Sequence, residues 1–162
     1  MRAYINQPDV SAVGFVVDAD ADPVNRWREV ADRITAANSD IQLPTAPDPD
    51  GTVIPENPAI GSPRIGIWIM PDNSATGELE DFVAQMIPGG DPVWPLSQDY
   101  IDGIPPEARK FDDDSITKNQ VHAWLAARRF PGLVGLAIRE GDLSVNNPLS
   151  QRFLTWLSRL FR

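Results

Sequence analysis

Two short apolar runs, each followed by acidic residues and then by a helical pattern, constrain this 162-residue chain most strongly. Residues 13–17 read Val-Gly-Phe-Val-Val, and residues 64–70 read Arg-Ile-Gly-Ile-Trp-Ile-Met. Runs of this length that are rich in β-branched residues predict strands buried on both faces of a sheet. Because such strands alternate here with helical patterns, we expect an α/β fold with a mostly parallel sheet flanked by helices.

The helical patterns begin at recognisable signals. Asp22-Pro23 predicts a helix start, because aspartate caps free backbone N–H groups and proline fits the first helical position. Apolar residues at helical spacing predict further helices over about 79–87, 115–129 and 148–161. The stretch between 88 and 114 is predicted to be looser, with Trp94, Tyr100 and Ile101 as packing residues. Residues 133–138 are predicted as a short strand.

Between the two apolar runs lies a proline-rich segment, residues 39–63, with prolines at 44, 47, 49, 55, 58 and 63. This density excludes a central strand or a long helix. We expect an extended loop with at most a brief edge strand near Val53. By its length the chain is predicted to form one domain over residues 1–162.

Composition limits the kinds of molecule that we expect the chain to bind. The net charge of −9 argues against a basic-patch nucleic-acid binder, although carboxylates that hold a metal ion can recruit phosphate, so DNA or RNA binding through a metal stays open. No apolar run approaches the roughly 20 residues of a membrane helix. With no cysteine and no apolar leader at the start, we expect a cytoplasmic protein without membrane contact.

Acidic side chains follow both predicted strands. Asp18 and Asp20 come after the first, Asp72 after the second, and Glu80 lies beside the apolar stripe of the next helix. The carboxyl ends of parallel strands meet at one sheet edge. Carboxylate oxygens suit Mg²⁺ or Mn²⁺, which activate water and stabilise charge on a phosphodiester. The alternative is that these are solvated turn acids.

Two further candidates lie on the predicted helix 115–129. His122 is the only histidine; a lone histidine is more often structural, and a role as base or phosphate contact is the sharper alternative. Lys118 would be able to hold a phosphate near the acids, although a helical lysine is usually just solvated.

With these residues in place, the sequence resembles the Toprim superfamily, the fold shared by topoisomerases, bacterial primases and the overcoming-lysogenization-defect (OLD) nucleases. More specifically, it resembles a group of small Toprim-like proteins related to the OLD nucleases. The resemblance implies that Asp18 and Asp20 hold the metal ion, with Glu80 and Asp72 as further ligands. It also implies phosphodiester chemistry or nucleotide handling, with phage defence as one setting. The matching segments are 14–20, 66–73, 77–82, 118–126 and 153–157.

The sequence departs from the Toprim pattern at its start. Toprim domains carry a glutamate for acid–base chemistry at the end of an earlier strand, and no glutamate precedes Val13 here. Residues 1–7 resemble the end of a helix that would follow the missing part. The expectation is that the N-terminal part of the core is missing: the start has been lost, another chain supplies the acid, or the domain is catalytically degenerate.

Two functions therefore compete. The first is a Toprim-like, divalent-metal-dependent nuclease or phosphoryl-transfer domain. The second is a catalytically degenerate regulatory or assembly module that keeps the fold and acts through a protein partner or a homo-oligomer. A generic nucleotide-binding domain ranks last, because the chain has no glycine-rich phosphate loop.

Overall fold

The computed structural model describes residues 1–7 and 9–162, which form two compact units. The sheet unit comprises Met1–Glu78 and Gln151–Arg162, and the helical unit comprises Leu79–Ser150. Two compact units can belong to one domain or to two, so the single domain over 1–162 stays a prediction.

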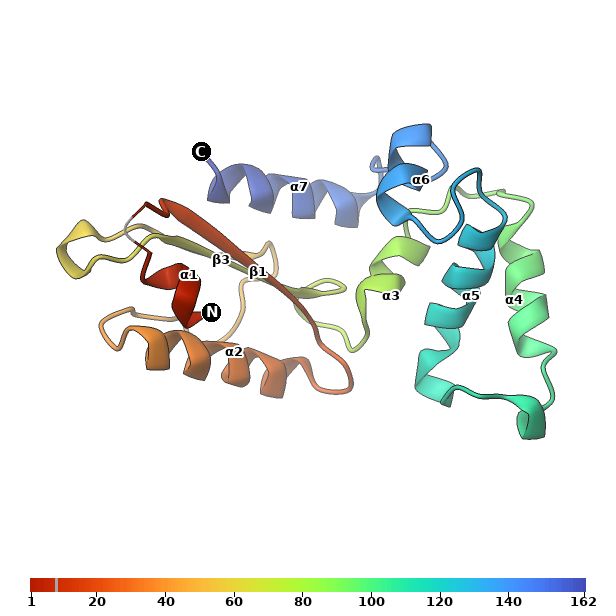
Figure 1. The fold of residues 1–162 in the computed structure, drawn as a ribbon, viewed down its shortest axis with the longest axis horizontal. Helices are drawn as coiled ribbons and strands as arrows, with labels where there is room; N and C mark the ends of the chain where they lie inside the picture. The colour runs from red at the N-terminus through yellow and green to blue at the C-terminus, as the bar shows by residue number, and fades with distance from the viewer. Residues whose placement is uncertain (8) are drawn as a thin grey trace. The chain divides into compact units, whose positions relative to one another are not determined.

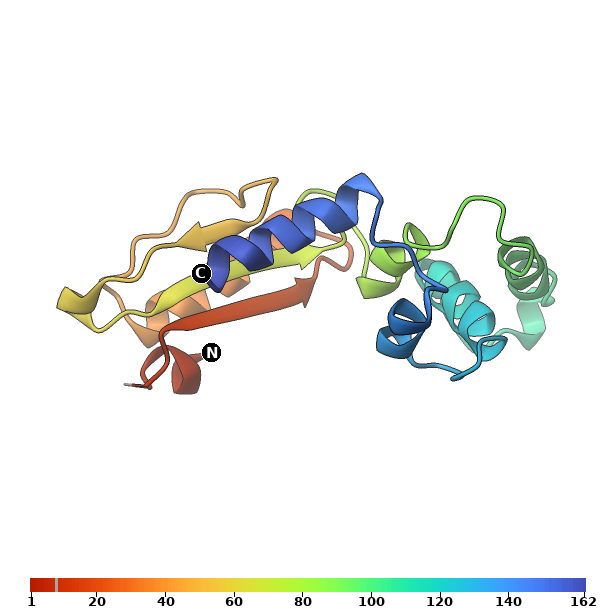
Figure 2. The same cartoon turned by 90° about the horizontal axis from the view of Figure 1, so that it is seen from above.

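The sheet unit is built on a three-stranded mixed sheet in the order β1-β3-β2 (Figures 1 and 2). β1 (Ala12–Asp18) runs parallel to β3 (Arg64–Met70), and β2 (Thr52–Ile54) pairs antiparallel with β3. Both predicted strands and the brief edge strand near Val53 are confirmed. The α/β class is also confirmed, but the sheet is small and mixed because β2, which lies within the proline-rich segment, runs antiparallel to β3.

Helices cover both faces of this sheet (Figure 1). On one face, α2 (Pro23–Ala37) packs its buried Trp27 and Val30 into a core with the isoleucines of β3. On the other face, Trp156 of α7 (Pro148–Leu160) packs against Trp68 of β3, with ring centroids 5.7 Å apart. The remaining elements of this unit are α1 (Arg2–Ile5) and a short 3₁₀ helix, η1 (Pro58–Ile60).

β1 differs from the prediction in one respect. It was expected to be buried on both faces, but its residues are only partly buried and Val16 is 47% exposed. The reason is its position: in the described part of the chain β3 is the only strand that pairs with β1, so β1 forms an edge of the sheet.

The helical unit contains α3 (Leu79–Ala84), α4 (Trp94–Asp102), α5 (Ile116–Ala126) and α6 (Val134–Glu140), with short 3₁₀ helices at Pro106–Ala108 and Asp113–Ser115. α3 and α4 both pack against α5. The helices predicted over 79–87 and 115–129 are therefore confirmed, each with shorter bounds.

Two predictions for the helical unit were wrong. The strand expected over residues 133–138 is helix α6, which ends at Gly141 with φ of 84°, a left-handed position that glycine adopts without strain. The stretch expected to be loose contains helix α4, whose first N–H groups are capped by the Asp91 carboxylate. Ile101 is buried as predicted, but Tyr100 is 66% exposed.

Helices that could cross a membrane are not found in the described residues: each is too short or too polar for a span.

Candidate functional site

Two of the candidate acids, Asp18 and Asp72, lie at or just beyond the carboxyl ends of the two parallel strands. Asp18 is the last residue of β1 and lies opposite Met70, the last residue of β3, in the parallel register. The backbone N–H of Ala19 donates to the Met70 carbonyl oxygen at 3.0 Å. Asp72 follows two residues after Met70. Asp18 and Asp72 are therefore brought to the same end of the sheet by neighbouring parallel strands.

The loops that follow these two strands are also joined to each other. The Asp20 N–H donates to the Gly77 carbonyl oxygen at 3.0 Å, and the Gly77 N–H donates to the Asp20 carbonyl oxygen at 2.9 Å. Asp20 adopts φ of 52°, in the left-handed region that aspartate tolerates better than most residues. The backbone at Asp20, just after β1, is thus fixed by its two hydrogen bonds to Gly77.

The Asp20 side chain already has a positive partner. Its carboxylate forms an ion pair with the guanidinium of Arg26, in the second turn of α2. The same guanidinium pairs with Glu29 at 2.9 Å. Arg26 therefore supplies, from within the chain, the positive charge that the sequence analysis assigned to a metal ion at Asp20.

Asp72 closes a turn. Its Oδ1 accepts hydrogen bonds from the Ser74 N–H at 2.9 Å, the Ser74 hydroxyl at 2.9 Å and the Ala75 N–H at 2.7 Å. Burial raises the pKa of Asp72, but these hydrogen bonds and the positive charge of Arg152 outweigh burial and leave the pKa below its ordinary value. The Asp72 carboxylate is consequently ionised and held by its own turn.

Glu80, Lys118 and His122 belong to the helical unit. Glu80 lies in the first turn of α3, and its Oε1 is 3.5 Å from Nε2 of His122 on α5. The Glu80 side chain is largely buried, whereas that of His122 is about half exposed. Lys118 lies one helical turn before His122. The structure thus brings Glu80 together with His122, a pair that the sequence analysis did not predict.

A divalent cation needs several ligating side chains grouped around one point. Within the residues that the structure describes, no three or more histidine, aspartate or glutamate side chains are grouped so as to hold a metal ion. Asp18, Asp20 and Asp72 offer the right oxygen chemistry for Mg²⁺. Their present arrangement does not form a cation site, so no chemical step is assigned to a metal ion.

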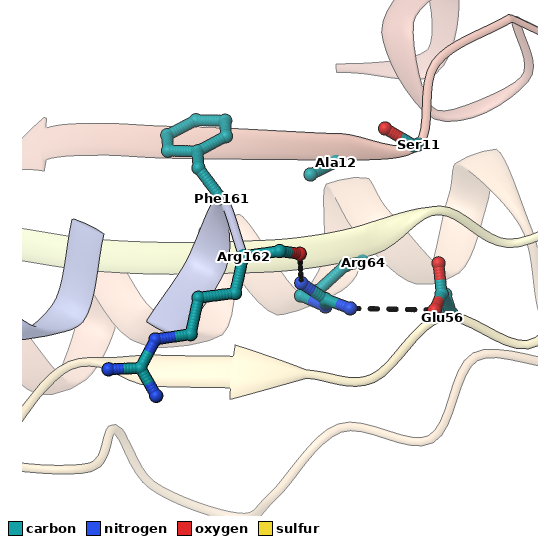
Figure 3. A pocket seen from close by; sticks show the side chains of 6 residues that line it. All are labelled: Ser11, Ala12, Glu56, Arg64, Phe161 and Arg162. Carbon is teal, nitrogen blue, oxygen red and sulfur yellow. Dashed lines mark hydrogen bonds and ion pairs between the residues drawn. The ribbon is translucent and has the colours of Figure 1, made fainter. Parts of the chain in front are cut away.

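A small cavity of about 90 Å³ lies at the opposite end of β1, lined by Ser11, Ala12, Glu56, Arg64, Phe161 and Arg162 (Figure 3). Small-molecule sites typically measure about 300–1,000 Å³. Within it, the Arg64 guanidinium donates to the Arg162 carbonyl oxygen at 2.6 Å and pairs with Glu56 at 3.4 Å. Arg64 thus joins the residues that follow α7 to β3. We therefore assign the polar side chains of this cavity a structural role and not a binding role.

Arg26 is the residue at this edge that the sequence analysis did not single out. A signal was present, because Arg26 follows the helix cap Asp22 by four residues and so lies about one turn into α2, close to the acids before the helix. In the sequence it was indistinguishable from the other arginines of the polar face of α2.

The protein is thus of the α/β class, and carboxylates lie at the carboxyl ends of its two parallel strands. The whole chain, residues 1–162, matches the family described as "Protein of unknown function (DUF3226)", and the chain belongs to that family. Comparisons with curated proteins and with solved structures gave no match.

Proposed function

We propose that this chain is a Toprim-like regulatory or assembly module that does not cleave nucleic acid by itself. The observation that carries the proposal is the ion pair between Asp20 and Arg26. An acid that should hold a catalytic cation is instead neutralised by a side chain six residues away.

Two further predicted metal ligands, Asp72 and Glu80, support this proposal in the same way. Asp72 holds its own turn through Ser74 and Ala75, and Glu80 is paired with His122. Each of these contacts contributes to the fold without a ligand. A module that keeps these two carboxylates and that of Asp20 as structural groups accounts for all three contacts.

The second candidate is a nuclease or phosphoryl-transfer domain that depends on Mg²⁺ or Mn²⁺. The convergence of Asp18 and Asp72 on one sheet edge favours it. For this function the cation would have to bind beside the positive charge of Arg26, which opposes cation binding at the Asp20 carboxylate. Lys118 and His122 would remain candidates for phosphate contact or acid–base chemistry.

Calorimetric titration of MgCl₂ and MnCl₂ into the purified protein separates the two candidates. We expect no binding heat and no metal-dependent cleavage of single- or double-stranded DNA or RNA. The variant Arg26→Met should remain folded and inactive. Asp112→Ala/Asp114→Ala, which removes two exposed acids of the helical unit, serves as the charge-matched control for Asp18→Ala/Asp20→Ala.

The module proposal is overturned if the wild type binds Mn²⁺ or cleaves nucleic acid, and if this activity is lost in Asp18→Ala/Asp20→Ala but kept in the control. The metal-dependent alternative would then stand, and Arg26→Met should bind the cation more tightly than the wild type because its competitor has been removed.

A further inference from the structure

The proline-rich segment, residues 39–63, is the feature of the sheet unit that the proposed function leaves unexplained. Two cavities of about 470 and 260 Å³ lie along it, and both are lined by Gln42, Ile54 and Pro55, so they adjoin. The larger falls within the roughly 300–1,000 Å³ of typical ligand sites. We call the two together the β2 groove. All residues that line it lie between positions 40 and 62, so the groove is built from one internal stretch of the chain.

The β2 groove follows the outer edge of β2. Thr52, Val53 and Ile54, which are consecutive, all line the larger cavity. Because successive side chains of a strand point to opposite faces, a cavity that touches three residues in a row follows the edge of the strand and not one face. Among the described strands only β3 pairs with β2, and Figure 2 shows the proline-rich segment running beside β2 on the side away from β3.

The hydrogen-bond pattern shows which backbone groups face the groove. The Asn57 N–H donates to the Ser62 carbonyl oxygen at 2.9 Å, and the Ser62 N–H donates to the Asn57 carbonyl oxygen at 3.0 Å. The same antiparallel register continues to Ile54, which lies opposite Ile65. Residues that bond across the ladder alternate with residues that do not. Ile54, three residues before Asn57, therefore directs its N–H and C=O away from β3.

A second observation agrees with this alternation. Thr52 also faces outward by the same count, and its carbonyl oxygen accepts a hydrogen bond from Nε1 of Trp156 at 3.0 Å instead of from a strand. For the Ile54 backbone no such partner is found in the part of the chain that the structure describes. One donor and one acceptor at Ile54 are thus open at the groove.

The opposite wall of the groove is extended and held by the core. Ile41 is buried and Leu43 packs against the same cluster of apolar residues, whereas Gln42, Pro44 and Ala46 line the larger cavity. This period of two is typical of an extended segment. Pro44 has no N–H to donate, so the wall does not close the ladder onto β2 at that position. The prolines of this segment therefore keep the groove open.

The charge of the groove selects its occupant. Residues 34–63 contain four acids and no lysine, arginine or histidine. Two of these acids, Asp40 and Asp48, line the groove, and no cationic side chain lines it. Because the chain carries a net charge of −9, a cationic occupant is attracted and a second copy that presents the same acidic segment is repelled.

We propose that the β2 groove binds an extended segment of a partner protein that carries both basic and apolar residues. One residue of this segment exchanges two backbone hydrogen bonds with Ile54 and so adds a strand beside β2. Its apolar side chains contact Ile54 and Pro44, and its basic side chains face Asp40 and Asp48. This inference rests on the proposed function, for which it names the chemistry of the partner.

Fluorescence anisotropy with a labelled synthetic peptide tests the proposal on the full chain. The probe has seven residues in which arginine alternates with valine, because valine favours an extended backbone. We expect a dissociation constant of about 100 μM or below. The same peptide with glutamate in place of arginine should not bind.

Two matched variants test whether the acids of the groove select the probe. Asp40→Asn/Asp48→Asn should raise the dissociation constant at least about threefold because two attractive charges are lost. Asparagine keeps the oxygen with which Asp48 accepts the Asp50 N–H. The control Asp112→Asn/Asp114→Asn removes the same charge from exposed residues of the helical unit and should leave the constant unchanged.

A backbone readout tests whether a strand is added. In wild-type protein the amide resonance of Ile54 should shift when the arginine peptide is added, and that of Val53, which faces β3, should shift much less. Ile54→Pro removes the open N–H without removing a bond to β3, so it should raise the dissociation constant at least about threefold. Urea unfolding shows whether this variant is folded, and the wild-type resonances give the same information without it.

Three results would overturn the inference. The first is no binding of the arginine peptide, and the second is equal weakening by both pairs of aspartate substitutions, which would show attraction by net charge alone. The third is protection of the Ile54 N–H that rises with protein concentration when no peptide is present, which would make a second copy the occupant. None of these results affects the proposed function, which fails only if metal-dependent cleavage is found.

Discussion

At the scale of single residues, two glycines decide how closely α7 approaches the sheet. Gly14 of β1 and Gly66 of β3 lie opposite each other in the parallel register. A Cβ atom on Gly66 would lie 2.5 Å from Leu160 Cδ2 and 2.9 Å from Trp156 Cζ2, and one on Gly14 would lie 2.9 Å from Leu160 Cδ2. The paired glycines thus form the depression into which the end of α7 packs.

We expect Gly66→Ala to lower the free energy of unfolding by about 1–3 kcal/mol, because the added methyl group overpacks a filled interface. Gly135→Ala on α6 is the control, because a methyl group added there would have no neighbouring atom within 4 Å. There alanine should stabilise the helix by up to about 1 kcal/mol. Urea unfolding of both variants measures the difference, and equal stability of Gly66→Ala and the wild type would contradict this packing.

At the scale of elements, the start of α2 shows a local signal that the structure confirms. The Asp22 carboxylate accepts a hydrogen bond from the Asn25 N–H at 2.9 Å, and Pro23 occupies the first turn. The cap fixes where α2 begins, and so it helps to set where Arg26 lies in space relative to Asp20. A helix start read from the sequence therefore positions the ion pair at the sheet edge.

Asp22→Ala should destabilise the protein by about 1 kcal/mol, because the first turn of α2 loses its acceptor. Asp22→Ser should restore most of this loss, since a serine hydroxyl can accept the same hydrogen bond. The shift of the urea midpoint at a constant slope measures both effects. If serine costs as much as alanine, the contribution of Asp22 comes from its charge near the helix and not from capping.

At the scale of the whole molecule, each unit contains an aspartate whose contribution to stability requires an ionised carboxylate. In the sheet unit this is Asp72. In the helical unit it is Asp91, which accepts a hydrogen bond from Trp124 Nε1 at 3.0 Å and lies 3.6 Å from Nη1 of Arg128. Burial raises the pKa of Asp91, but the hydrogen bonds from Trp124, Val93 and Trp94 and the charge of Arg128 bring the pKa below its ordinary value.

Both units should therefore lose stability in acid. Because each pKa is lower in the folded protein than the ordinary value of 3.8, folding is favoured above that value and loses this contribution as the pH falls through the folded pKa. We expect the free energy of unfolding to change little near neutral pH and to fall below about pH 4.

Asp91→Asn offers the matched variant for this pH dependence. It should be less stable than the wild type at pH 7 by on the order of 3 kcal/mol, because Arg128 loses a largely buried partner. It should also lose less stability than the wild type on acidification. Urea unfolding at a series of pH values gives both quantities, and parallel curves for the two proteins would show that Asp91 does not carry the acid dependence.

Local patterns were enough to predict much of the sheet unit. Several features follow from residues adjacent in sequence. These are the strand predicted at 13–17 and found at 12–18, the strand at 64–70, the cap at Asp22, and the helix predicted over 148–161 and found over 148–160. The shared edge of Asp18 and Asp72 follows as well, because parallel strands end on the same side. The sequence by itself therefore determined which acids lie beyond the sheet.

Only the tertiary structure decided which side chains pair with the candidate acids and which strand is outermost in the sheet. The pairing of Asp20 with Arg26, and of Glu80 with His122, depends on how helices pack, which sequence spacing does not specify. The short apolar segment 133–138 suits a strand or a buried helix equally well, and packing made it α6. The outermost position of β1 among the described strands is decided in the same way, because an apolar strand can be central or outermost, and only the number of neighbouring strands distinguishes the two.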